Sequence, residues 1–275
     1  MDAAIYRGMS RAALDAAYNN RAAVRDYPAI AAARAERSER VRGARRFRAD
    51  LRYGEAPRER LDFFPAVRAG APVLAFFHGG YWQSNDKEAS SFLVEGPLER
   101  GFAVALVEYT LAPEADMDRI VAEAGRALDW LARRAGDHGA DPGRLFVAGH
   151  SAGGHLAATA LGRADVAGVL GISGLFDLEP IRLCYLDEKL RLTEEQVRRH
   201  SPLRGIPGKR APAAIAAGAR ELPELVRQSS DYAAALGVAP LLLPAHDHFS
   251  ILEELARPQG ALCEALLGLA AGAAA

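Results

Sequence analysis

The middle of the chain alternates short apolar runs with longer stretches of helical character. Nearly continuous apolar runs of this length are typical of strands that are buried on both faces of a parallel sheet. The predicted strands are Pro72–Phe77, Phe102–Tyr109, Leu145–Ala148, Val166–Ile172, Ala213–Ala217 and Ala239–Leu243. The predicted helices between them include Asp118–Arg134, His155–Gly162 and Pro223–Leu236. This order predicts an α/β fold with a mostly parallel central sheet and helices on both of its faces.

The N-terminal part of the chain departs from this alternation. Residues 1–45 are rich in Ala, Arg and Glu and predict helices, with a break near residues 26–28. Two further runs, Phe47–Tyr53 and Leu61–Phe64, lie on either side of Gly54. They predict an antiparallel hairpin that leads into the sheet.

An internal segment, residues 177–208, also interrupts the alternation. Within it, Thr193 is followed three residues later by Gln196, which is the pattern of a capping box that begins a short helix. In open α/β sheets, ligands bind beyond the carboxyl ends of the strands, and the insertion falls at that edge. We therefore expect residues 177–208 to form a small cap over the functional site.

Composition adds limits to this picture. The chain has 275 residues, 50% of them hydrophobic, which is enough for one large core, and we expect a single domain over residues 1–275. The net charge is -1, so no overall field attracts nucleic acid or acidic lipid. Arg34–Arg60 contains ten arginines interleaved with five acidic residues, and we interpret it as a solvated or packing surface rather than a nucleic-acid site.

The sequence also predicts a location. The N-terminus has neither the charged and apolar regions of a signal peptide nor an apolar run long enough to span a bilayer. Cys184 and Cys263 are too few and too unpatterned for a disulfide framework or a zinc site. We expect a soluble, cytoplasmic protein without a membrane partner, a metal or a cofactor.

A candidate nucleophile lies directly after the third apolar run. The sequence there is Gly149-His150-Ser151-Ala152-Gly153, and an alanine-rich predicted helix follows. Strand, sharp turn and helix with a serine at the apex form the nucleophile elbow of α/β-hydrolases, in which small residues flank the serine because the turn is tight. The motif therefore predicts a serine hydrolase with Ser151 as its nucleophile.

A serine nucleophile needs a base, which in this fold follows the last strands. The histidines downstream of Ser151 are His155, His200, His246 and His248. His155 lies one helical turn beyond the serine and is expected to pack, and His200 falls in the cap. His248 stands just before the final helix, so we choose it over His246. Half of a metal site at residues 246–248 is the weaker interpretation, because further ligands at suitable spacing are missing.

The acid that orients the base should follow the strand Ala213–Ala217. Glu221 lies in the loop just past this strand, whereas the helix that follows should carry Glu224 and Asp231 as solvated surface charges. Asp247 is adjacent to His248, so its side chain should point away from that histidine. Glu221 is therefore the expected acid.

The transition state also needs donors for the developing oxyanion. His78-Gly79-Gly80-Tyr81-Trp82 follows the strand Pro72–Phe77, where α/β-hydrolases place an oxyanion loop of this kind. Glycine lets backbone amides approach the substrate closely. We expect the oxyanion hole to be formed around Gly79, Gly80 and Tyr81, together with the amide of Ala152 after the nucleophile.

Several blocks between residues 72 and 255 resemble the arylformamidases, also called kynurenine formamidases. These blocks are HGGYWQSNDK at 78–87, GHSAGGHLA at 149–157, SGLFDLEP at 173–180, ELPEL before RQS at 221–229, and DHF at 247–249. The resemblance places Glu221 where the family has its acid, although the animal enzymes carry Asp there. The block YTLAPE at 109–114 is similar to one in the hormone-sensitive-lipase-like esterases.

The resemblance implies hydrolysis of an aryl formamide such as N-formylkynurenine, through a formyl-enzyme, within tryptophan catabolism. Tyr81 and Trp82 would either line the pocket and bind the substrate ring or pack in the core. A substrate carboxylate could meet a cation of the cap, the candidates being Arg182, Lys189, Arg191 and Arg204.

Two alternatives remain beside this hypothesis. The same catalytic residues would serve a carboxylesterase that acts on small acyl or aryl esters. A non-catalytic binding protein is disfavoured because such proteins usually lack a catalytic residue, whereas Ser151, an acid and His248 are all present. The N-terminal helices could cover the active site or form a contact in a homodimer, and the sequence does not choose between these roles.

Overall fold

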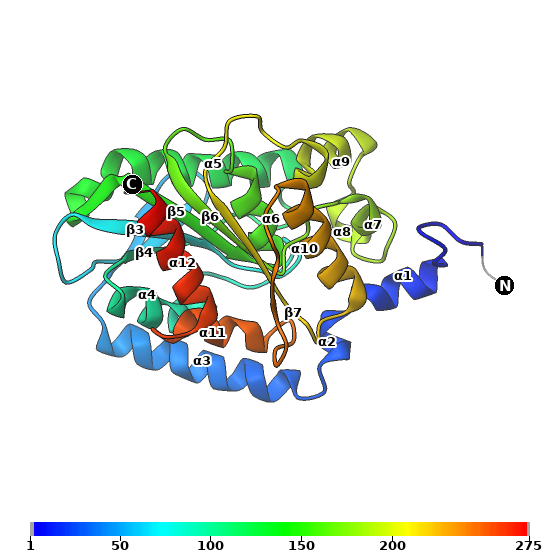
Figure 1. The fold of residues 1–275 in the computed structure, drawn as a ribbon, viewed down its shortest axis with the longest axis horizontal. Helices are drawn as coiled ribbons and strands as arrows, with labels where there is room; N and C mark the ends of the chain where they lie inside the picture. Colours follow the sequence, from blue (N-terminus) through cyan, green and yellow to red (C-terminus); the bar gives the residue numbers. More distant parts are fainter. Residues whose placement is uncertain (1–2, 274–275) are drawn as a thin grey trace.

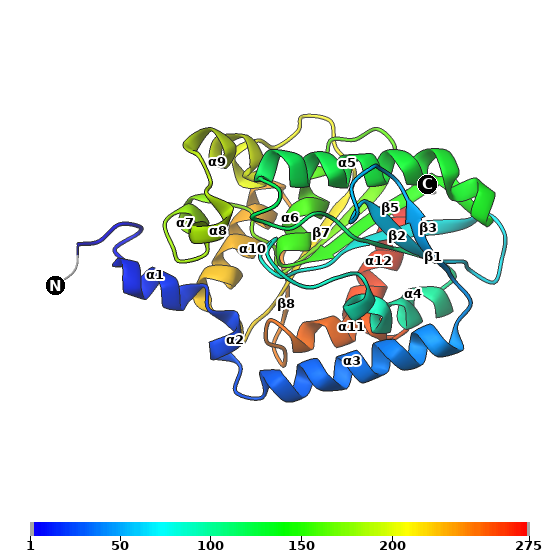
Figure 2. The same cartoon turned by 180° about the vertical axis from the view of Figure 1, so that it is seen from behind.

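A computed structural model describes residues 3–273, so the outermost two residues at each end of the predicted domain lie outside the described part. Eight strands form one sheet in the order β1-β2-β4-β3-β5-β6-β7-β8, and their labels are divided between Figure 1 and Figure 2. The strands are β1 (Arg48–Arg52), β2 (Arg60–Phe64), β3 (Ala71–Phe77), β4 (Ala103–Val107), β5 (Ala140–His150), β6 (Val166–Ile172), β7 (Ala213–Gly218) and β8 (Leu241–Leu243). The β1–β2 and β2–β4 pairs are antiparallel, and the others are parallel. This confirms the predicted fold class.

Helices cover both faces of the sheet, as Figures 1 and 2 show. The α-helices of the described residues, including those that do not lie on the sheet, are α1 (Arg11–Ala17), α2 (Asn20–Ala23), α3 (Tyr27–Ala44), α4 (Glu95–Glu99), α5 (Met117–Arg134), α6 (Ala152–Thr159), α7 (Glu179–Arg182), α8 (Asp187–Leu190), α9 (Glu194–His200), α10 (Pro223–Ala235), α11 (Glu253–Ala256) and α12 (Ala261–Gly272). Short 3-10 turns lie at Glu88–Val94, Ala135–His138, Pro202–Arg204 and Ser250–Leu252.

The two faces of the sheet carry separate hydrophobic cores. One core joins the sheet to α5, α6, α10 and the cap, with Ile120, Leu156 and Tyr232 fully buried or nearly so. The other joins it to α3, α11 and α12 and includes Val41 and Leu266. Apolar residues of β3, β4 and β5 alternate between these two cores, which explains their nearly continuous apolar sequences.

Most elements differ somewhat from their predicted boundaries, and for three of them the physical reason is clear. β5 begins at Ala140, because Ala140 and Asp141 already pair with the start of β3. β8 is confined to Leu241–Leu243 at the edge of the sheet, directly after Pro240, which has no amide hydrogen to donate to a ladder. α6 begins at Ala152, since the helix follows the sharp turn at Ser151 at once.

The cap consists of α7, α8, α9 and the turn Pro202–Arg204. The capping box at the start of α9 is confirmed: Gln196 N donates to Thr193 Oγ1 and Thr193 N donates to Gln196 Oε1, both at 3.1 Å. The predicted break in the N-terminal helical segment lies between α2 and α3. Within residues 3–273, no helix is both long and apolar enough to span a bilayer.

Candidate active site

The predicted elbow is a strained turn between β5 and α6. Ser151 has φ 57° and ψ -118°, and its amide donates to the carbonyl of Ile172 at 2.9 Å. A Cβ atom on Gly149 would lie 2.0 Å from the carbonyl oxygen of Gly153, and one on Gly153 would lie 1.9 Å from that of Phe77. Only glycine fits at these two positions, so the sequence pattern around Ser151 has a direct steric cause.

The structure brings His248 and Glu221 together. His248 Nδ1 lies 2.7 Å from Glu221 Oε2, and both side chains are buried. The loop after β7 carries Glu221, and the loop after β8 carries His248, so adjacent parallel strands bring the pair to one edge of the sheet. The contact fixes the histidine ring so that Nε2 is left free to act as a base.

Glu221 has further partners that the sequence did not single out. Ser173 Oγ donates to Glu221 Oε1 at 2.6 Å, and the amide of Gly218 donates to the same oxygen at 2.6 Å. Together with His248, these donors give the buried carboxylate of Glu221 hydrogen-bond partners on both of its oxygens. Ser173 lies directly after β6 with φ 49°. Its position at the end of the strand beside β5 is the signal that could have found it.

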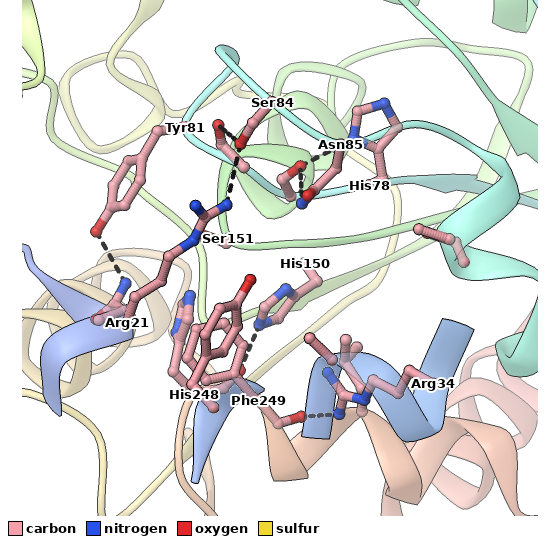
Figure 3. Close-up of a pocket in the computed structure, with 18 of the residues that line it drawn as sticks. Arg21, Arg34, His78, Tyr81, Ser84, Asn85, His150, Ser151, His248 and Phe249 are labelled. Atoms are coloured by element: carbon pink, nitrogen blue, oxygen red, sulfur yellow. Dashed lines mark hydrogen bonds between the residues drawn. The ribbon is translucent and has the colours of Figure 1, made fainter. Parts of the chain in front are cut away.

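Ser151 and His248 line the same cavity (Figure 3). Among the described residues, no hydrogen bond joins Ser151 Oγ to His248 Nε2, and such contacts are often long before substrate binds. His150 packs beside His248 with ring centroids 4.5 Å apart, and its Nε2 donates to the carbonyl of His248 at 2.7 Å. Burial lowers the pKa of His150 well below its usual value, so this ring is neutral.

The predicted oxyanion loop lies beside Ser151. A Cβ atom on Gly79 would lie 3.1 Å from Ser151 Cβ, so this backbone approaches the serine closely. Gly80 has φ 118°, a conformation that favours glycine. Asn85 Nδ2 donates to the carbonyl of Gly79 at 3.1 Å, which fixes the loop. Among residues 3–273, the amides of Gly79, Gly80, Tyr81 and Ala152 have no assigned acceptor.

His78 anchors the start of this loop. Its Nδ1 lies 2.8 Å from the carbonyl of Gly79, and its Nε2 lies 3.0 Å from Glu108 Oε1. Burial acts to raise the pKa of Glu108, but hydrogen bonding with His78 and the charge of Arg58 hold that pKa below its usual value. The carboxylate also accepts from the amide of Lys87 at 3.1 Å. His78 and Glu108 thus position the loop from beneath.

The cavity has a volume of about 380 Å³, within the range of small-molecule sites. Its wall comes from the oxyanion loop, the elbow, the His248 loop, α8 of the cap and, unexpectedly, the N-terminal helices. Asn20 and Arg21 of α2 and Tyr27 and Arg34 of α3 all line it. Residues of the N-terminal helices therefore form part of the cavity wall.

Comparison with known proteins places this chain in a family. A sequence model described as the alpha/beta hydrolase fold matches residues 74–204. The kynurenine formamidase of Danio rerio is 34% identical, over 84% of this chain and 84% of its own length. That of Salmo salar is 32% identical, over 80% and 81% respectively. The chain belongs to the kynurenine formamidase family. It is therefore a hydrolase of the α/β-hydrolase fold.

A solved structure agrees with this family assignment at the level of the fold. A predicted thioesterase from a Silicibacter species is 30% identical, with a TM-score of 0.82 over 91% of this chain and 97% of that one. An esterase B from Lactobacillus rhamnosis has a TM-score of 0.72 at 19% identity, over 93% and 97%. This chain thus shares its fold with both of these proteins.

Two predictions about this member of the kynurenine formamidase family need correction. Trp82 does not line the cavity: it is fully buried in the core on the α6 face, where its ring packs edge-on against His155. Tyr81, its neighbour, does line the cavity. Glu224 is on the predicted helix but is buried rather than solvated, because it binds Arg227 and the hydroxyl of Tyr18.

The other histidines and the other acid that the sequence offered have different partners. His155 is fully buried, as expected of a packing residue, and its Nε2 donates to the carbonyl of His200. His246 pairs with Glu254 at 3.1 Å, and Asp247 accepts from the amides of Phe249 and Ser250. None of these three side chains contacts Glu221, and the described residues contain no cluster of potential metal ligands.

Proposed function

We propose that the protein hydrolyses an aryl formamide such as N-formylkynurenine to the free aryl amine and formate. The observation that carries the proposal is that this member of the kynurenine formamidase family has Ser151 and His248 lining one cavity of suitable size, with Glu221 bound to His248. The reaction would place the protein in tryptophan catabolism.

The arrangement can perform the reaction in two steps. Ser151 Oγ attacks the formyl carbon while His248 Nε2 takes its proton, and the amides of the oxyanion loop and Ala152 stabilise the oxyanion. His248 then protonates the departing aryl nitrogen as the carbon–nitrogen bond breaks. Water, activated by His248, attacks the formyl-enzyme, and formate leaves as Ser151 regains its proton.

Ester hydrolysis is the second candidate. The observation in its favour is the likeness to a predicted thioesterase at 30% identity. The same nucleophile and oxyanion hole serve esters and amides, and the leaving group makes the difference. An aryl amine leaves more readily than an alkyl amine, so an aryl formamide suits a serine hydrolase.

A substrate comparison tests the proposal. kcat/KM is measured for N-formyl-L-kynurenine, p-nitrophenyl acetate and p-nitrophenyl butyrate, with Ser151→Ala as the blank. We expect the formamide to be preferred by about a hundredfold or more, equivalent to about 2.7 kcal/mol in transition-state stabilisation. Hydrolysis of the esters alone would assign the protein to the carboxylesterases instead.

The proposal also includes a cytoplasmic location and a homodimer, as expected from the sequence. Cys184 and Cys263 are both free and buried, which suits a reducing compartment. Cell fractionation and light scattering test these two statements. Recovery in a membrane or secreted fraction, or a monomer at micromolar concentration, would contradict them.

A further inference from the structure

The charges that line the cavity are unbalanced. Three cations, Arg21, Arg34 and Lys189, face it, whereas the described lining contains no Asp or Glu. Side chains in a cleft of one sign raise the local concentration of ligands of the opposite sign. The net charge of the whole chain is only -1, so this imbalance belongs to the cavity itself.

One of the three cations is already neutralised. Arg34 is largely buried, hydrogen-bonds the carbonyl of Phe249 and pairs with Glu253 at 3.5 Å. The cap cations Arg182 and Arg204 are engaged in the same way, by Glu179 at 2.7 Å and by Asp177 at 3.0 Å. These arginines serve the fold and are not available to a ligand.

Arg21 and Lys189 differ from them. Arg21 touches only neutral groups: its Nη2 lies 3.4 Å from Ser84 Oγ, and its guanidinium lies 5.4 Å from the centroid of the Tyr27 ring (Figure 3). Among residues 3–273, neither Arg21 nor Lys189 forms an ion pair. Both are exposed at the edge of the cavity, where a ligand can reach them.

Polar contacts fix the helix that carries Arg21, α2, relative to Ser151. The hydroxyl of Tyr81, in the oxyanion loop, donates to the carbonyl of Tyr18 at 2.6 Å and accepts from Asn20 Nδ2 at 2.8 Å. These contacts tie α2 to the loop beside Ser151. Gln83 Nε2 donates to the carbonyl of Leu186 at 2.8 Å and ties the same loop to the start of α8, which carries Lys189.

We propose that Arg21 and Lys189 form a carboxylate-binding subsite for the leaving-group side of the substrate. The inference rests on the proposed function, because an aryl formamide derived from an amino acid carries a carboxylate at the end remote from the formyl group. The two cations make the enzyme selective for aryl formamides that carry this carboxylate over those that lack it. They are specificity-determining residues and take no part in the chemical step.

The test compares substrates that differ only in the carboxylate. kcat/KM is measured for N-formyl-L-kynurenine and for N-formylkynuramine, which lacks it, with wild type, Arg21→Gln, Lys189→Gln and the double variant. Because both cations are reached by solvent, each single change should lower the ratio of the two kcat/KM values by about fivefold, close to 1 kcal/mol. The loss should appear in KM and should diminish at high salt.

Two matched controls accompany these variants. Arg25→Gln and Lys209→Gln remove exposed cations that do not line the cavity, and they should keep the wild-type ratio. Arg21→Lys should restore part of the selectivity, because it keeps the charge but loses the planar guanidinium. An unchanged ratio in the double variant, or a wild type without preference for the carboxylate, would overturn the subsite.

A second pair of substrates separates this proposal from the proposed function. If wild type cleaves neither formamide, the aryl formamidase activity fails. The subsite is then measured with an aryl acetate whose leaving phenol carries a propionate, beside its neutral propionamide counterpart. Selectivity for the anionic ester that falls in the double variant would keep the subsite, and equal turnover of the two esters in wild type would refute it.

Discussion

At the scale of single residues, the site depends on which carboxylate orients His248. Glu221 has the position, with Oε2 at 2.7 Å from His248 Nδ1 and Oε1 held by Ser173 and Gly218. Asp247 is adjacent to His248 in sequence but uses its carboxylate on the amides of Phe249 and Ser250. The geometry therefore favours Glu221 as the acid.

Substitution separates these two carboxylates. Glu221→Ala should lower kcat by about 10⁴-fold, as loss of the acid does in serine proteases, because His248 loses its orientation and the partner for its positive charge. Asp247→Ala should keep kcat within a few-fold and cost about 1 kcal/mol of stability, since it removes a turn cap. A fully active Glu221→Ala beside an inactive Asp247→Ala would reassign the acid.

At the residue level, the sequence indicated the local geometry of the site but not the contacts that depend on distant parts of the chain. The glycines around Ser151 predicted a tight turn. In the structure, a Cβ atom on Gly149 or Gly153 would collide with a backbone carbonyl, which is the steric reason for glycine there. The position of Trp82, two residues after Gly80, does not reveal whether its side chain points into the cavity or into the core. At Trp82, φ is 57°, and the chain there turns the ring into the core on the α6 face.

At the scale of elements, α6 carries a fully buried histidine one turn after the nucleophile. Burial lowers the pKa of His155 to about 3, although the hydrogen bond to the carbonyl of His200 acts against this. In the unfolded chain the same ring titrates near 6.5. Between pH 6.5 and 3 the unfolded state therefore binds more protons, so the free energy of unfolding falls as the pH falls.

Because of this linkage, we expect His155 of α6 to make the free energy of unfolding sensitive to acid. From pH 7 to pH 5, His155 should account for about 2 kcal/mol of the lost stability. His155→Gln keeps a donor for the carbonyl of His200 and removes the titration, so its stability should fall less over this range. Urea unfolding at both pH values, beside wild type, measures the difference. Equal losses in the two proteins would contradict a role of His155 in this acid sensitivity.

The order of the elements was predictable, but their ends were less so. Strands buried on both faces produce continuous apolar runs, and Val166–Ile172 is the same in the sequence and in the structure. The start of β5 at Ala140 was missed, because polar residues at Asp141 and Arg144 interrupt the apolar pattern there. Pairing with β3, a tertiary effect, decides that boundary.

At the scale of the whole molecule, the N-terminal segment closes over the sheet edge that carries the site. Tyr18 is fully buried, far from α10 in sequence, and its hydroxyl donates to Glu224 Oε2 at 3.2 Å and accepts from Gln228 Nε2 at 2.8 Å. Gln228 Oε1 in turn accepts from the amides of Phe176 and Asp177, where the cap begins. One polar network thus joins N-terminal segment, α10 and cap.

Removal of the Tyr18 hydroxyl tests the role of this polar network. Tyr18→Phe removes the hydroxyl and leaves the polar groups of Glu224 and Gln228 unsatisfied in a buried place. It should cost about 1–3 kcal/mol in the free energy of unfolding. It should also raise KM for the substrate more than it lowers kcat, because α2 forms the cavity wall without touching Ser151. The control Tyr6→Phe, which removes a partly exposed hydroxyl, should cost less.

The sequence could not show this part of the site. Residues 1–45 predicted helices, but nothing in their pattern indicated which surface they cover, because long-range packing selects it. The sequence also could not show which cations line the cavity. Cap residues were the expected partners of a substrate carboxylate, and Lys189 does line the cavity, whereas Arg21 lies 130 residues before Ser151 and only the folded chain brings it there.

The central claim is that Ser151 cleaves an aryl formamide. The most direct measurement is the release of L-kynurenine and formate from N-formyl-L-kynurenine by wild type and by Ser151→Ala, with circular dichroism to show that both are folded. The account predicts equimolar products from wild type and a loss of about 10⁴-fold or more in the variant. Turnover by Ser151→Ala at the wild-type rate would contradict it, as would a wild type that leaves the formamide intact.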